Sequence, residues 1–71
     1  MTTKEIRVKL NELKPIIPKE GTFSMGEHGS VLDLHSMIRS HLGVLDGDAD
    51  ERTKRPYRFR LEKVIKILEL V

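Results

Sequence analysis

The stretch LDLHSMIRSHLGVL, residues 32–45, carries the helical pattern on which the fold depends. With Ile38 placed at zero on a helical wheel, Leu42 and Leu45 fall within about 40° of it. The opposite side carries one long cation among small residues: Ser36, Arg39, Ser40 and Gly43. The pattern predicts an amphipathic helix whose outward face has no bulky side chain to keep the backbone from a surface that it approaches.

The segment before this helix allows two interpretations. In the first, Ser24 caps a short helix, with Glu27 at the capping-box position, and a polar break at His35 and Ser36 separates it from the next helix. In the second, Ser30 begins one longer helix over residues 30–42. Both interpretations remain open at this point.

The N-terminal part carries a second helical stripe. Its apolar residues recur at i, i+4, i+7 and i+11, namely Ile6, Leu10, Leu13 and Ile17. Thr2 or Thr3 can serve as the N-cap with Glu5 in the first turn, and Pro15 should end the regular helix near Lys14. We expect a turn and a short extended piece at residues 22–23 to follow.

The segment RPYRFRL, residues 55–61, favours a strand. Tyr57, Phe59 and Leu61 alternate with arginines, and Pro56 suits the first position of a strand. A competing interpretation places Pro56 at the first position of a long helix that Thr53 caps and that runs to the end of the chain. From Leu61 onward the apolar spacing is helical in both interpretations.

The terminal helix, predicted over about residues 62–71, has apolar residues on more than one side. Ile67 and Leu70 lie off the main stripe, so this helix has more apolar surface than a 71-residue monomer can easily cover. Such an excess is typical of a dimer interface and predicts a homodimer. The residues assigned to the interface are Val64, Ile67, Leu68, Leu70 and Val71.

Length and charge limit the class of protein. A chain of 71 residues without Cys predicts one domain, residues 1–71. No apolar run approaches the ~20 residues of a membrane span, which predicts a cytoplasmic protein with no membrane contact. Net charge is only +2, but residues 46–51 carry four acids and residues 52–60 carry five bases. A basic cluster interleaved with aromatic residues suits phosphate binding, although a charge run is more often an ordinary solvated surface.

Taken in order, these segments resemble a winged helix-turn-helix DNA-binding domain over most of residues 5–61. FSMGEHGSVLDLHSMIRSHLGVL and RPYRFRL carry the resemblance. It implies a mostly α fold with a small β component, built as a three-helix core plus the C-terminal helix. It also implies a sequence-specific transcriptional regulator that binds double-stranded DNA without a cofactor, and the size would suit a phage- or plasmid-type repressor or excision factor.

The resemblance assigns roles to particular residues. His35 would contact a phosphate, Ser36 and Ser40 would face the major groove, and Arg39 would donate two hydrogen bonds to a guanine edge. The basic segment would act as the wing, along the DNA backbone or in the minor groove. The predicted DNA-binding residues are His35, Ser36, Arg39, Ser40, Arg52, Lys54, Arg55 and Arg58.

Other classes of site and function were weighed against this one. His28, His35 and His41 do not share a helical face, and the acidic loop has Glu51 and Tyr57 where a calcium loop needs Gly and Glu, so we expect no metal site. The sequence shows no nucleophile with a base and no phosphate loop, and we expect no enzyme. Two alternatives are a carrier-like helical module with Ser30 as its attachment point, and a small adaptor or inhibitor that binds a protein partner.

Overall fold

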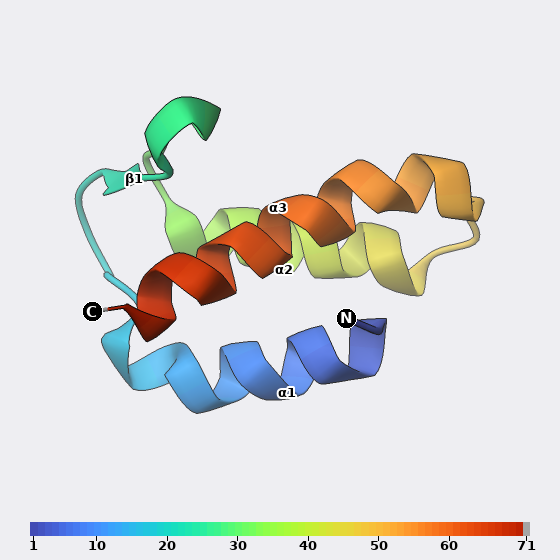
Figure 1. Cartoon of the computed structure of the whole chain (residues 1–71), viewed down its shortest axis with the longest axis horizontal. Coiled ribbons are helices and arrows are strands. Elements are labelled where there is room, and N and C mark those ends of the chain that lie inside the picture. Colours follow the sequence, from blue (N-terminus) through green and yellow to red (C-terminus); the bar gives the residue numbers. More distant parts are fainter. Residues whose placement is uncertain (71) are drawn as a thin grey trace.

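Three α-helices and a two-stranded hairpin make up residues 1–70, the part of the chain that the computed structural model describes. The helices are α1 (Thr3–Leu13), α2 (Leu34–Asp46) and α3 (Glu51–Glu69). A 3₁₀ turn, η1 (Lys14–Ile16), follows α1, and the hairpin consists of β1 (Phe23–Ser24), the 3₁₀ turn η2 (Gly26–His28) and β2 (Ser30–Val31). The colour order in Figure 1 shows that α2 and α3 run in opposite directions and that α1 runs parallel to α3.

The first helix is confirmed as predicted. The Thr2 hydroxyl accepts the backbone N–H of Glu5 at 3.1 Å, and the Glu5 carboxylate accepts the N–H of Thr2 at 3.1 Å, which completes a capping box. These hydrogen bonds to Thr2 lower the pKa of the Glu5 carboxyl. The α-helical part ends at Leu13, and Pro15 lies in the following 3₁₀ turn.

The region before α2 contradicts both predicted helices. The short helix from Ser24 and the longer helix from Ser30 are wrong, because Phe23 pairs with Val31 and Ser24 with Ser30 in an antiparallel hairpin. The chain reverses through Gly26 and Gly29, whose φ angles of 62° and 88° lie in the left-handed region that glycine adopts without strain.

The α2 helix begins at Leu34 because Asp33 caps it. The Asp33 carboxylate accepts the Ser36 backbone N–H at 3.1 Å and the Ser36 hydroxyl at 2.8 Å. The same hydrogen bonds to Ser36 lower the pKa of the Asp33 carboxyl. Ile38, predicted to face the core, is buried, and so are Leu34, His41 and Leu45.

The largest correction concerns residues 51–69, which form one continuous helix. The predicted strand at residues 57–61 is wrong; the competing interpretation, one long helix through this segment, is confirmed up to Glu69, but its start at Pro56 under a Thr53 cap is wrong. Asp50 is the N-cap, and its carboxylate accepts the Thr53 backbone N–H at 2.8 Å. Pro56 therefore lies inside the helix, and residues 46–61 contain no wing.

The fold class is confirmed at the level of a mostly α-helical protein with a small β component. The finer prediction, a three-helix core followed by a separate C-terminal helix, is not what residues 1–70 show. The predicted C-terminal helix is the second half of α3, and the hairpin lies between α1 and α2 rather than after the predicted recognition helix.

The core is centred on α3. Its fully or almost fully buried side chains Leu61, Val64, Ile65 and Leu68 pack with apolar side chains of α1, α2 and the hairpin. Val64 and Leu68, at 0% and 2% exposure, belong to the core of a single chain, which removes them from the predicted dimer interface. Ile67 is half-buried against the core, Leu70 is 83% exposed, and Val71 lies outside the described residues.

Candidate nucleic-acid interface

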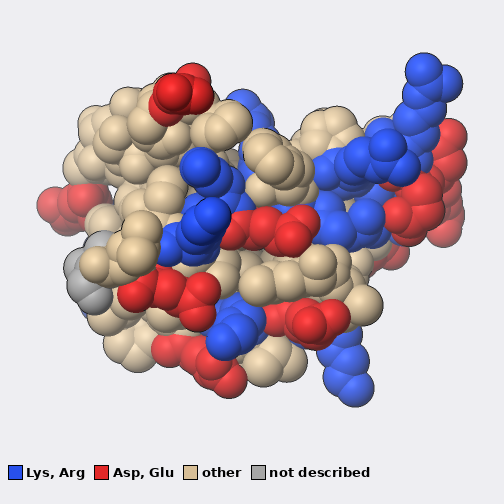
Figure 2. Space-filling model, in the orientation of Figure 1, with Lys and Arg blue, Asp and Glu red and all other residues tan. Residues whose placement is uncertain are grey.

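The outward side of α3 carries a row of cations. Arg52, Arg55, Phe59, Lys63 and Lys66 follow one another at i, i+3, i+7, i+11 and i+14. At 3.6 residues per turn, these positions fall within an arc of about 80°, opposite the buried side of the helix. We call these five residues the basic face. Figure 2 shows Lys and Arg side chains along α3, with one group of acidic side chains at the end where the helix begins and others beside the cations farther along.

The acids of α3 lie away from the basic face or are already paired. Glu62 accepts the Met1 ammonium group at 3.1 Å, and Glu69 lies 3.6 Å from the Lys9 Nζ, so both belong to the flank that meets α1. Glu51 pairs with Arg58 at 2.9 Å. Within residues 1–70 no cation of the basic face forms an ion pair, although Glu62 lies beside this face, one turn before Lys66.

Phe59 lies at the centre of the basic face and is 55% exposed. The only aromatic contact found for it among the described residues is an edge-on one with His28 of the hairpin, whose ring centroid lies 5.6 Å away at an interplanar angle of 69°. The hairpin thus borders the basic face at its middle. An apolar ring exposed between cations can contact a base or a base methyl group while the cations meet phosphates.

The predicted wing residues separate into two groups. Arg52 and Arg55 are exposed and belong to the basic face. Lys54 is half-buried, two turns before Leu61 on the inward side of the helix, and Arg58 is half-buried and paired with Glu51. The structure therefore leaves two of the four predicted residues available to a ligand of the basic face.

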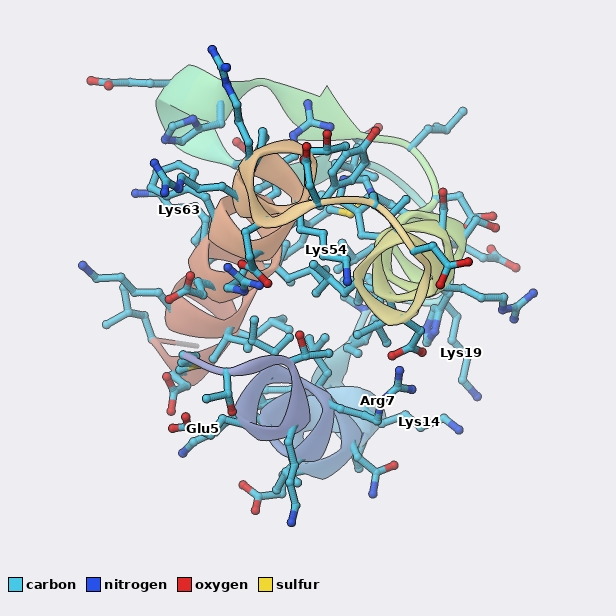
Figure 3. All side chains as sticks on the ribbon, turned by 90° about the vertical axis from the view of Figure 1, so that its right-hand side faces the viewer. Glu5, Arg7, Lys14, Lys19, Lys54 and Lys63 are labelled. Atoms are coloured by element: carbon cyan, nitrogen blue, oxygen red, sulfur yellow. The ribbon has the colours of Figure 1, made fainter. Side chains whose placement is uncertain are left out.

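The predicted recognition residues lie on another side of the molecule. Ser36, Arg39 and Ser40 are exposed on α2, but the Ser36 hydroxyl already donates to the Asp33 carboxylate. His35 and Arg39 line a groove between α1 and α2. In Figure 3, Lys63 of the basic face points to one side, whereas Arg7 and Lys14, which line this groove with Arg39, lie on the opposite side. One straight duplex against α3 cannot also contact Arg39.

Sequence reasoning missed Lys63, Lys66 and the central position of Phe59. The signal was present, because Arg52, Arg55 and Lys66 share a helical face with Phe59 when residues 51–69 are read at a helical period. Reading residues 57–61 at a period of two separated these residues and placed Phe59 on the same side as Tyr57 and Leu61.

Among the described residues, His41 of α2 is the one polar residue that is buried, at 7% exposure, and it faces α3. Its ring meets Tyr57 edge-on at a centroid distance of 4.9 Å, and its Nε2 lies 3.5 Å from an Arg60 nitrogen. Burial, and then the positive charge of Arg60, lower the pKa of the His41 imidazole. Neutral His41 is thus a packing residue of the helical hairpin.

Within the described part of the chain, no three His, Asp or Glu side chains come together as a metal site would require. None of the helices in residues 1–70 has the length and apolarity needed to cross a membrane.

Comparison with known proteins gives no relative from which a role could be transferred. No protein-family model, no curated protein and no solved structure matches the chain.

Proposed function

We propose that the protein binds double-stranded DNA through the basic face of α3 and acts there as a small transcriptional regulator. The observation that carries the proposal is the alignment of four cations, without acid partners in residues 1–70, around the exposed ring of Phe59. This proposal does not depend on a wing or on the outward face of α2.

The dimensions of α3 suit a duplex. From Arg52 to Lys66 the helix rises about 21 Å at 1.5 Å per residue, and the major groove, about 12 Å wide, admits an α-helix. Cations spread along such a length can reach phosphates on both sides of the groove. Phe59 would then face base edges, where an aromatic ring can pack against a thymine methyl group.

The acidic residues at the beginning of α3 would orient the DNA. Asp46, Asp48, Asp50 and Glu51 lie in or beside the loop before the helix, and all are exposed. Since phosphates are repelled there, we expect the duplex to extend along α3 away from this loop. Arg52 and Arg55 would mark the edge of the contact and could donate to a guanine or a phosphate.

The test compares two variants of equal charge. The first replaces the basic-face cations by glutamine (R52Q, R55Q, K63Q, K66Q). The matched control replaces four cations of other surfaces (K4Q, K14Q, K19Q, R39Q). Fluorescence anisotropy with a labelled duplex of mixed sequence should show that wild type and the control bind, with a salt slope of about −3.6 for four phosphate contacts. The basic-face variant should lose most of its affinity and most of this slope.

Three results would contradict the proposal. Wild type that does not bind duplex DNA at low salt would rule it out, and equal losses in the two variants would reduce the effect to net charge. Tighter binding to a single strand than to the duplex, lost on Phe59→Ala, would indicate a surface on which unpaired bases stack.

A further inference from the structure

A groove of about 560 Å³ lies between α1 and α2, away from the basic face. It exists because α1 and α2 each pack more extensively on α3 than on each other. Its floor is aliphatic, with the buried side chains Leu10, Ile17 and Ile38, and the half-exposed Val8 continues this surface outward. The volume falls within the range of roughly 300–1,000 Å³ that ligand sites occupy.

The rims of the groove are basic on both sides. On α1 and the turn that follows it, Arg7, Asn11 and Lys14 lie at i, i+4 and i+7, and on α2, His35 and Arg39 lie at i and i+4. No Asp or Glu lines the groove. An apolar floor between cationic rims is complementary to a ligand that combines apolar and acidic groups.

The nearby acids leave these cations available. Arg7 pairs with Asp46 beyond one end of the groove, but both side chains are about half exposed, and an exposed pair of this kind contributes at most about 1 kcal/mol. The hydrogen bonds of the Asp33 carboxylate go to Ser36 at the start of α2 and are the main reason that its pKa is lowered, and the nearby positive charge of Arg39 lowers it further. Among the described residues, Lys14 and Arg39 form no ion pair.

We propose that this groove, called here the α1–α2 groove, is a docking site for an acidic amphipathic helix of a partner protein. The spacing of the rim cations distinguishes a helix from a ligand with a single anionic group. Arg7 and Lys14 are about 10 Å apart along the axis of α1 and its last turn at 1.5 Å per residue, and Arg39 faces them from the other rim. A helix with acids at i, i+3 or i+4 and i+7 presents charges over the same length, while its apolar side enters the groove.

The proposal is independent of DNA binding by α3. The two surfaces share no residue, so a partner helix could dock while the basic face is occupied. A contact two to three turns long is small for a protein interface, and we therefore expect a transient complex with micromolar affinity.

The experiment uses nuclear magnetic resonance on the isotope-labelled full chain. The probe is a synthetic amphipathic peptide with leucines at i, i+4 and i+7 flanked by glutamates, and the control peptide has lysines in place of the glutamates. The glutamate peptide should shift the amide signals of residues 7–17 and 35–42, and the lysine peptide should not.

Charge reversal at the rims provides the second arm. The exposed changes Lys14→Glu and Arg39→Glu, made together, should weaken binding of the glutamate peptide at least tenfold. The matched control, Lys63→Glu with Lys66→Glu on the basic face, should leave that binding unchanged. Both variants change only solvent-exposed or half-exposed positions, and unchanged spectra outside the altered residues would show that each still folds.

Several outcomes would overturn the proposal. Peptide shifts confined to α3, or equal losses in the two variants, would mean that the peptide senses general positive charge. Equal binding of the lysine peptide would exclude charge recognition. If laurate shifts the same groove signals at a lower concentration than the peptide does, the groove is a site for a lipid anion. If duplex DNA shifts these signals, the groove binds nucleic acid. Loss of DNA binding in the basic-face variant, by contrast, would leave the groove proposal untouched.

Discussion

Replacing Pro56 by alanine tests whether α3 is continuous, and the basic face depends on that continuity. Pro56 is the sixth residue of α3, where its ring nitrogen cannot donate to the Arg52 carbonyl and its ring crowds that carbonyl. Proline in a helix interior is about 3 kcal/mol less favourable than alanine. Proline also restricts the unfolded chain, which offsets roughly 0.4–1 kcal/mol of this difference.

The expected result is therefore a gain of about 2 kcal/mol in the free energy of unfolding of the Pro56→Ala variant. For a domain of this length, such a gain raises the Tm by roughly 8–16 °C. Urea and thermal unfolding followed by far-UV circular dichroism measure both quantities. Arg55→Ala, at an exposed neighbouring position, is the control and should change stability little.

A Pro56→Ala variant no more stable than wild type would refute the continuous helix. Proline is favourable at the first position of a helix, so this result would mean that α3 begins at Pro56. Two cap variants give an independent answer. With Asp50 as the N-cap, Asp50→Ala should lower the unfolding midpoint more than Thr53→Ala does, and the reverse order would support the later start. Arg52 and Arg55 would then leave the basic face, and the DNA-binding proposal would lose half of its cations.

Three further results are expected. Neutralising Arg52 and Arg55 together should flatten the salt slope of DNA binding by about 1.8 units if each meets one phosphate, and an unchanged slope would assign both to the solvated surface. Because the pKa of His41 is lowered in the folded protein, the unfolded chain takes up its proton first as the pH falls below about 6.5. The free energy of unfolding should therefore decrease as the pH falls from about 6.5 to the pKa of His41 in the folded protein. In urea titrations at several pH values, His41→Gln should make this decrease smaller. A variant with the same pH dependence as wild type would exclude His41 as its source. The homodimer stays a prediction, and the exposed Leu70 is the residue on which to test it. In sedimentation experiments, Leu70→Glu should convert the dimer into a folded monomer. A wild-type protein that is monomeric at high micromolar concentration would contradict the dimer.

The elements that local chemistry determines were predictable from the sequence. The α1 helix combines an apolar stripe at helical spacing with a capping box between Thr2 and Glu5, and both signals come from the helix and the residue directly before it. The buried side of α2 followed in the same way from Ile38 and Leu45. Its beginning did not, because both interpretations of the preceding segment placed a helix start at a serine, whereas Asp33 is the cap.

The α3 helix shows why a short aromatic segment misleads. Tyr57 and Leu61 are two apart from Phe59, which suits a strand, but they are also four apart from each other, which suits a helix. The packing partner that decides between them is distant in the sequence, since the Tyr57 ring lies against His41 of α2. Asp50, three residues before Thr53, is a typical N-cap residue, but in the sequence it was counted only as one of the acids of the loop.

The candidate site could be predicted only in part for the same reason. Arg52 and Arg55 were identified from their local charge density alone. Their alignment with Lys63 and Lys66 depends on the helix continuing through Pro56, which intrinsic propensity argues against. Tertiary packing of the following four apolar side chains outweighs that local preference.

The order of the helices along the chain also has a kinetic consequence. Only residues 47–50 separate α2 from α3, so these two helices can meet through a loop that closes within about 10–100 ns. The α1 helix meets α3 through far longer chain separations, as in the pair between Lys9 and Glu69. Contacts between distant segments form later because the closure of longer loops costs more entropy. We therefore expect the α2–α3 hairpin to form first and α1 to join it last. In native-state hydrogen exchange, the amides of α1 should open at a lower free energy than those of α3, and a ligand held between α1 and α2 should slow the opening of α1.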